Sequence, residues 1–86
     1  MEKRFHTATI TIYDRNAAFD KIQNLLHQFG KHIVLRVGYP ICDSNCAIIF
    51  LILKMSNDRL GALSGKIGQL PDVNIKSNSL DIKEQI

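Results

Sequence analysis

The stretch from Cys46 to Met55, CAIIFLILKM, decides the fold of this 86-residue chain. In an extended conformation its alternate residues would form two apolar faces, one with Ile48, Phe50 and Ile52 and the other with Ala47, Ile49, Leu51 and Leu53. A short run that is apolar on both faces is typical of a strand buried inside a sheet. We therefore expect a central strand here, with less apolar strands outside it.

The N-terminal part predicts a strand followed by a helix. In Phe5–Tyr13 one face would carry Phe5, Thr7, Thr9, Thr11 and Tyr13, and the other His6, Ala8, Ile10 and Ile12. This alternation is typical of a strand. Asp14 or Asn16 can then cap a helix whose apolar stripe runs from Ala18 to Phe29. Gly30 would end that helix.

Two more strands and a second helix complete the pattern. Ile33–Tyr39 predicts a strand that ends at Pro40, with Ile33, Leu35 and Val37 on one face and Val34, Arg36 and Gly38 on the other. After the central strand, Ser56 begins a cap for a helix with leucine and isoleucine at helical spacing up to Leu70. Val73–Leu80 predicts the last strand.

The order of these elements predicts an α+β fold of the ferredoxin-like βαββαβ type. Right-handed crossovers place two helices on one face of a four-stranded antiparallel sheet, with strand order 4-1-3-2. Residues 1–80 would form a single domain, and residues 81–86 a C-terminal tail.

The other face of the sheet would have no helices, yet the central strand still presents an aliphatic row there. Such a row is rarely left in water, so we expect a second copy of the chain to cover it or to pair with an edge strand, forming a dimer or tetramer. The residues expected at this interface are Val34, Arg36, Ile49, Leu51 and Leu53.

Composition and charge narrow the possible partners. Eleven basic and eight acidic residues give a net charge of +3, and they are spread along the chain, which disfavours direct binding of nucleic acid. The longest apolar run, Cys46–Leu53, is far too short to cross a membrane. The charged start, Met1 to Arg4, does not look like a signal peptide, so we expect a cytoplasmic protein without a membrane partner.

Cys42 and Cys46 flank a turn and raise the possibility of a metal site. A closed metal site needs about four ligands, and His6, His27 and His32 lie on other elements, so ligands would have to come together across an interface. The metal hypothesis uses Cys42, Cys46 and His27. Two small, partly buried thiols are the simpler interpretation.

No motif predicts catalysis or identifies a cofactor. The stretch Gly61–Lys66, GALSGK, resembles a phosphate-binding loop, but it is one residue short and lies inside the second helix. We expect its glycines to allow close packing of that helix. Neither a catalytic triad nor paired carboxylates can be recognised, so the chain is not expected to be an enzyme.

Three stretches together resemble a known family: EKRFHTATI, LRVGYP and AIIFLILK-x3-D-x2-GALSGKIGQL-x2-V-x-IK, which ends at Lys76. They are similar to the small regulators of iron-only hydrogenase systems, which are grouped with ACT-like domains and with the C-terminal domain of the nickel-responsive repressor. The resemblance implies an ACT-like regulatory module that assembles into oligomers. The loop Asp14–Ala17 lacks the glycine typical of ACT domains that bind amino acids, and the chain has no residues left for the repressor's DNA-binding segment.

Our leading hypothesis is therefore an oligomeric ACT-like regulatory domain that senses a small-molecule effector or docks another regulatory protein at subunit interfaces. Arg36 would offer a cation on the helix-free face of the sheet. The residues expected to bind a ligand are Asp14, Arg15, Asn16, Arg36, Gly38 and Tyr39. A metal-responsive module and a protein–protein adaptor without a ligand are the alternatives.

Overall fold

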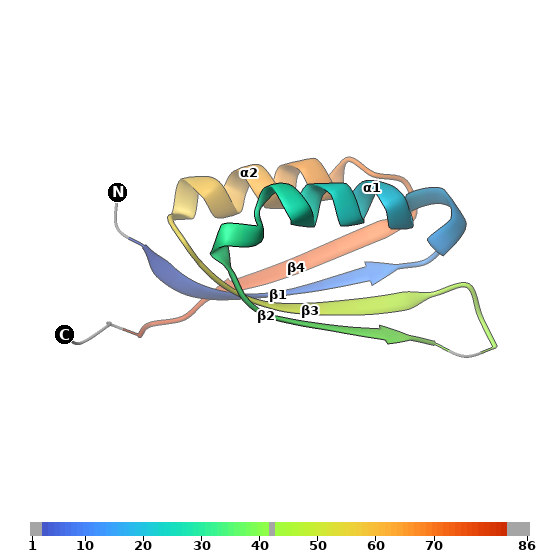
Figure 1. Cartoon of the computed structure of the whole chain (residues 1–86), viewed down its shortest axis with the longest axis horizontal. Coiled ribbons are helices and arrows are strands. Elements are labelled where there is room, and N and C mark those ends of the chain that lie inside the picture. The colour runs from blue at the N-terminus through green and yellow to red at the C-terminus, as the bar shows by residue number, and fades with distance from the viewer. Residues whose placement is uncertain (1–2, 42, 83–86) are drawn as a thin grey trace.

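The structure, a computed structural model, describes residues 3–41 and 43–82. Its elements are β1 (Arg4–Ile12), α1 (Arg15–Gln28), the 3₁₀ turn η1 (Gly30–His32), β2 (Ile33–Pro40), β3 (Ala47–Met55), α2 (Asn57–Gly68) and β4 (Val73–Ser79). The strands form one antiparallel sheet in the order β2-β3-β1-β4, which confirms the predicted fold and strand order (Figure 1).

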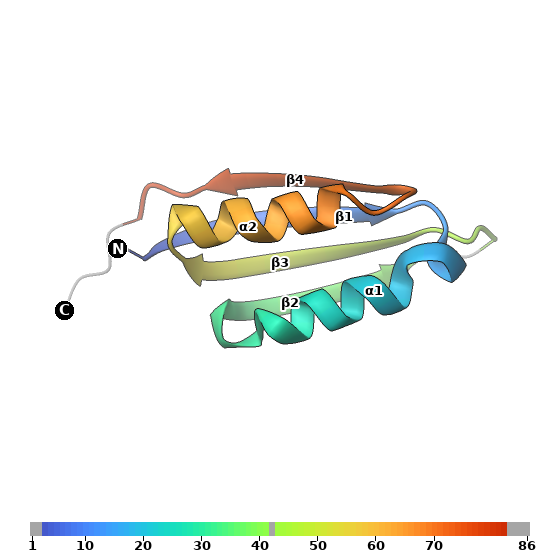
Figure 2. The ribbon, with the colours of Figure 1, turned by 90° about the horizontal axis from the view of Figure 1, so that it is seen from above.

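Both helices lie on the same face of the sheet. Seen from above, α2 lies over β1 and α1 lies over the edge strand β2 (Figure 2). Asp14 caps α1 by accepting a hydrogen bond from the amide of Asn16, and the Ser56 hydroxyl caps α2 by accepting one from the amide of Arg59. Both caps begin their helices where the sequence predicted them.

The core lies between the helices and the inner face of the sheet. The inner row of β3 contains Ile49, Leu51 and Leu53, which are all at most 3% exposed. We expected these three residues at an oligomer interface on the helix-free face, and that assignment was wrong. The error arose because both rows of β3 are apolar, so alternation alone does not show which row the helices cover.

A β-bulge at Val34 overturns the predicted faces of β2. Ile33 pairs with Leu53, but Leu35 pairs with Ile52, so the two residues lie on opposite faces although they are two positions apart. Beyond the bulge Arg36 pairs with Leu51 and faces the helices. Arg36 is therefore not on the helix-free face, and Ile33 does not share a face with Leu35 and Val37.

The helix-free face carries what we call the open apolar patch. Its most exposed members are Leu35, Val37 and Tyr39 of β2, which are 44%, 50% and 63% exposed. They pair with Ile52, Phe50 and Ile48 of β3, which are half-buried. The patch ends at β1, where the same face carries Thr7, Thr9 and Thr11.

The glycines of α2 do not have the role we expected. A Cβ atom added at Gly61, Gly65 or Gly68 would meet nothing within 4 Å. The prediction that glycines let α2 pack closely against a neighbour is therefore wrong within a single chain.

Candidate functional site

A cavity of about 280 Å³ lies between α1 and the sheet edge formed by β2. We call it the α1–β2 cavity. It is lined by Arg15, Phe19 and Gln23 of α1, by Arg36, Gly38, Tyr39 and Pro40 of β2, and by Ala47, Ile48 and Ile49 of β3. Four of the six residues predicted to bind a ligand, Arg15, Arg36, Gly38 and Tyr39, are thus brought together.

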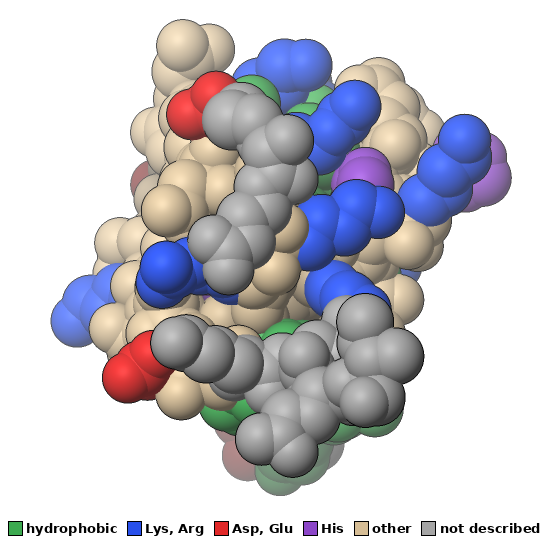
Figure 3. Space-filling model, turned by 90° about the vertical axis from the view of Figure 1, so that its left-hand side faces the viewer, with side chains coloured by type: hydrophobic (Ala, Val, Ile, Leu, Met, Phe, Trp, Pro, Cys, Tyr) green, Lys and Arg blue, Asp and Glu red, His purple; other side chains and the backbone are tan. Residues whose placement is uncertain are grey.

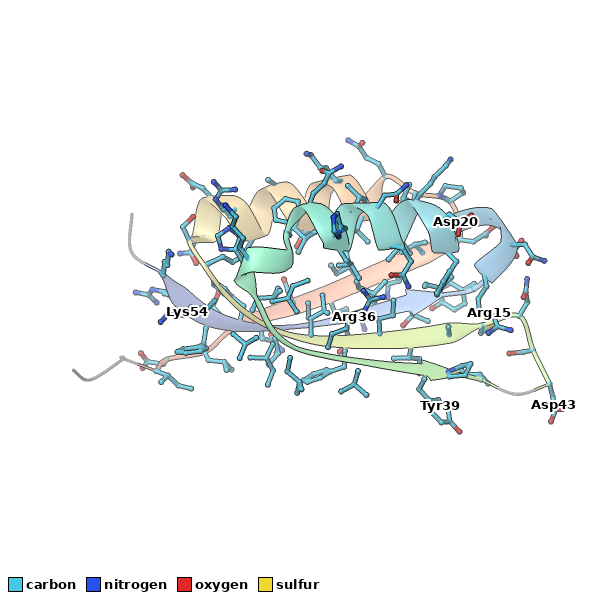
Figure 4. All side chains as sticks on the ribbon, in the orientation of Figure 1. Arg15, Asp20, Arg36, Tyr39, Asp43 and Lys54 are labelled. Atoms are coloured by element: carbon cyan, nitrogen blue, oxygen red, sulfur yellow. The ribbon has the colours of Figure 1, made fainter. Side chains whose placement is uncertain are left out.

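The cavity exists because the strands beneath the start of α1 carry little bulk. A Cβ atom at Gly38 would meet nothing within 4 Å, and Gly38 pairs with Ile49 on the face that α1 covers. Because β2 is an edge strand, no further strand closes the side of the cavity. The ring of Tyr39 points to the helix-free side, so Tyr39 lines the cavity without filling it (Figure 4).

Two guanidinium groups border the α1–β2 cavity without carboxylate partners. Arg36 donates a hydrogen bond of 2.6 Å from Nη2 to Oε1 of Gln23, which ties β2 to α1. Across residues 3–41 and 43–82, neither Arg15 nor Arg36 forms an ion pair. The first turn of α1 contains Arg15 and no acidic residue, although the positive end of a helix dipole favours an acid there. Among the described residues that line the cavity, two are cations and none is an acid.

The remaining predicted ligand residues, Asp14 and Asn16, lie at the start of α1 and take part in local structure. Oδ1 of Asp14 accepts hydrogen bonds from the Asn16 amide at 3.1 Å and from Nδ2 of Asn45 at 2.6 Å. The Arg15 amide donates to the carbonyl of Asn45 at 2.9 Å. Asn45, which the sequence analysis did not single out, thus anchors the turn before β3 to α1.

The metal hypothesis finds no group of ligands in one chain. Cys42 lies outside the described residues, and Sγ of Cys46 lies 3.5 Å from the carbonyl of Tyr13. His27 is in the last turn of α1, whereas Cys46 lies near the first turn. Among the residues that the structure describes, no three His, Cys, Asp or Glu side chains come close enough to hold a metal ion.

His6 is the one titratable side chain that is buried in the described core. Its Nδ1 lies 2.9 Å from Oγ of Ser79 and its Nε2 lies 2.9 Å from the carbonyl oxygen of Met55. Both ring nitrogens are thus used by the fold, which leaves none for a ligand.

Comparison with known proteins decides the family. Residues 4–77 match the TM1266-like family, which is described as "Iron-only hydrogenase system regulator, putative". The chain belongs to this family. The resemblance seen in the sequence is thereby confirmed.

Solved structures agree with this assignment. Protein TM1266 from Thermotoga maritima is 51% identical, with a TM-score of 0.89 over 93% of this chain and 100% of that chain. The ACT domain from GTP pyrophosphokinase of Chlorobium tepidum is 19% identical in its crystal structure, with a TM-score of 0.73 over 88% of this chain and 99% of that domain. At that identity the likeness shows the fold alone, which is ACT-like.

No curated protein shows significant similarity to the chain. The description of the matching family names a regulator. Within the described part of the chain, neither helix is long and apolar enough to cross a membrane.

Proposed function

We propose that this chain is a cytoplasmic regulatory domain of an iron-only hydrogenase system that binds a small anionic ligand in the α1–β2 cavity and self-associates beside it. The observation that supports this most strongly is the pair Arg15 and Arg36, which border one cavity without carboxylate partners in the described chain. Uncompensated charge beside an apolar wall favours the binding of a counter-charge.

The chemistry of the cavity favours a carboxylate or phosphate group. A guanidinium presents several N–H donors in a planar fork that matches these anions. Within residues 3–41 and 43–82, Arg15 and Arg36 use this capacity in one hydrogen bond to a side chain, that of Arg36 with Gln23. Phe19 and Ile49 supply apolar wall. A volume of about 280 Å³ lies at the lower end of ligand pockets and suits a ligand of metabolite size.

The sheet edge beside the cavity supports self-association through β2. Edge strands are usually protected by lysines, prolines or bulges, because their unpaired backbone groups attract other strands. The edge strand β2 has a bulge at Val34 and ends at Pro40, but between them it exposes Leu35, Val37 and Tyr39. The same face of the other edge strand, β4, carries Asn74, Lys76 and Asn78. A second copy pairing with β2 would extend the sheet and close the open side of the α1–β2 cavity. A ligand held there would favour one packing of the subunits over another.

Light scattering and native mass spectrometry test the assembly. We expect a dimer or tetramer, and a strict monomer at micromolar concentration would refute self-association. Ligand binding is tested by thermal shift with a panel of carboxylates and phosphate esters. An active compound should lose roughly tenfold or more in affinity with Arg36→Gln and much less with the exposed control Lys21→Gln.

Gly38→Val separates ligand binding from folding. Because nothing lies within 4 Å of the added Cβ, valine should fill the cavity while β2 keeps its stability. Loss of ligand binding with an unchanged melting temperature would support the site. If no compound raises the melting temperature of an intact oligomer, the domain acts instead as an adaptor without a ligand. If metal ions alone raise the melting temperature, the metal-responsive alternative is favoured.

A further inference from the structure

Five of the cations that are scattered along the sequence lie together at one end of the molecule. This end, on the left in Figure 1, holds the start of β1, the turn η1, the end of β3 and the start of α2. Five cationic residues from these four segments lie there: Lys3, Arg4, Lys31, Lys54 and Arg59. Viewed from that end, blue side chains gather across the surface, and red ones lie at its margin (Figure 3). We call this surface the basic end.

The acids of the described chain are distributed in the opposite way. Asp14, Asp20, Asp43 and Asp72 lie in the first turns of α1 or in the turns at the far end of the sheet, and Figure 4 shows Asp20 and Asp43 far from Lys54. Only Asp58 and Asp81 lie near the basic end. Among the residues that the structure describes, five cations and two carboxylates thus lie at this end. In residues 3–41 and 43–82, Lys3, Arg4, Lys31 and Arg59 form no ion pair.

A hollow of about 410 Å³ opens at the basic end, lined by Lys3, His32, Ser56, Asp58, Arg59 and Ala62. Lys3 and Arg59 contribute cations from two segments that are far apart in sequence. The Ser56 hydroxyl accepts from the Arg59 amide and keeps its own proton available for an acceptor. Of the remaining cations, Lys31 adjoins His32 of the lining, and Arg4 and Lys54 belong to adjacent, paired strands at the same end of the molecule.

We propose that this hollow binds a small molecule that carries phosphate groups. Lys3 and Arg59 line the hollow and Lys31 adjoins His32 of its lining, which favours a ligand with several negative charges. Each phosphate monoester carries close to two negative charges at neutral pH. Lysine, arginine and a hydroxyl donor are the side chains that commonly hold phosphate oxygens. Arg15 and the α1–β2 cavity lie at the start of α1, whereas this hollow lies near the end of α1, beside His32. The two proposed sites are therefore separate.

The shape of the basic end favours a compact ligand over nucleic acid. The molecule extends 45 × 22 × 18 Å, and the cations occupy the narrow end of its long axis. Proteins that read duplex DNA usually lay the side of a helix or ribbon into a groove and follow the backbone with many cations. Here turns and strand ends form the surface, and only two cations line the hollow itself.

NMR titration of the ¹⁵N-labelled protein with inorganic pyrophosphate tests the proposal. We expect saturable shifts at the amides of residues 56–62 and of His32. Affinity should fall about tenfold with Lys3→Gln or Arg59→Gln and stay within about twofold with Lys21→Gln, which removes an exposed cation from the middle of α1. Asp58→Asn should tighten binding by about threefold, because a carboxylate no longer opposes the anion.

Several results would overturn the proposal. One is an absence of saturable shifts, and another is an equal loss of affinity with Lys21→Gln. Sulfate binding as tightly as pyrophosphate would reveal nonspecific attraction of anions. Duplex DNA that binds through the same amides more tightly than pyrophosphate, with a steep salt dependence, would make nucleic acid the ligand. Arg36→Gln should leave pyrophosphate binding at the basic end intact. A negative result for this proposal can therefore be distinguished from a negative result for ligand binding in the α1–β2 cavity.

Discussion

Replacing His6 by alanine should strongly destabilise the fold, because the imidazole joins three strands. His6 lies on β1 and is completely buried on the face that the helices cover. Its Nε2 donates to the carbonyl of Met55 at the end of β3, since a carbonyl can only accept. In the neutral ring Nδ1 then accepts from the hydroxyl of Ser79 at the end of β4.

The magnitude follows from what each partner would lose. Without the ring, the carbonyl of Met55 is left buried and without its side-chain donor, which costs about 1–3 kcal/mol. The vacated volume adds a cavity cost, so we expect His6→Ala to lower the free energy of unfolding by about 3–4 kcal/mol. Ser79→Ala removes one hydrogen bond at a residue that is itself exposed, and should cost only about 0.5–1.5 kcal/mol.

Urea unfolding followed by far-UV circular dichroism, at one fixed protein concentration, measures these differences. The double variant should be scarcely less stable than His6→Ala alone, because the hydrogen bond it removes is already absent. A loss below about 1 kcal/mol for His6→Ala would refute the reasoning. So would full additivity of the two substitutions, because it would mean that the ring and the hydroxyl act independently.

Three other substitutions test separate features by the same measurement. Asp14→Ala should cost about 1–2 kcal/mol, because it removes the cap of α1 and the bond to Asn45; an unchanged stability would show that the cap is dispensable. Gly65→Ala should raise the free energy of unfolding by about 0.5–1 kcal/mol, since nothing lies near the added Cβ, and a decrease would indicate a partner packed on α2. Val37→Lys should change subunit stability by no more than about 0.5 kcal/mol but weaken self-association in light scattering, and an unchanged oligomer would exclude the open apolar patch from the interface.

Local patterns in the sequence were sufficient to predict the helices and strands and their order along the chain. The caps at Asp14 and Ser56 and the apolar stripes behind them are short-range features, and each lies within one helix. The order of elements together with the handedness of crossovers then leaves few topologies. The strand order of the sheet was predictable for this reason, although its pairs are distant in sequence.

The charge distribution could not be predicted from the same signals. Lys3 and Arg59 are separated by most of the chain, and along the sequence each has an acid close by. Folding brings the start of β1 beside the start of α2, while the turns that carry Asp43 and Asp72 lie at the other end. The spacing of charges along the chain therefore suggested an even distribution over the surface, whereas the topology places five cations at one end and four of the described acids towards the other.

Which residues line the α1–β2 cavity depends on the bulge at Val34. No pattern in the sequence predicted this bulge. A regular strand would alternate from Ile33 onward and would place Arg36 on the helix-free face, as we expected. The extra residue reverses the alternation, so that Arg36 and Gly38 both lie under α1 and Leu35, Val37 and Tyr39 turn outward. One inserted residue thus creates both the cationic wall of the cavity and the open apolar patch. The proposed ligand site and the proposed self-association surface therefore both depend on the same change in register.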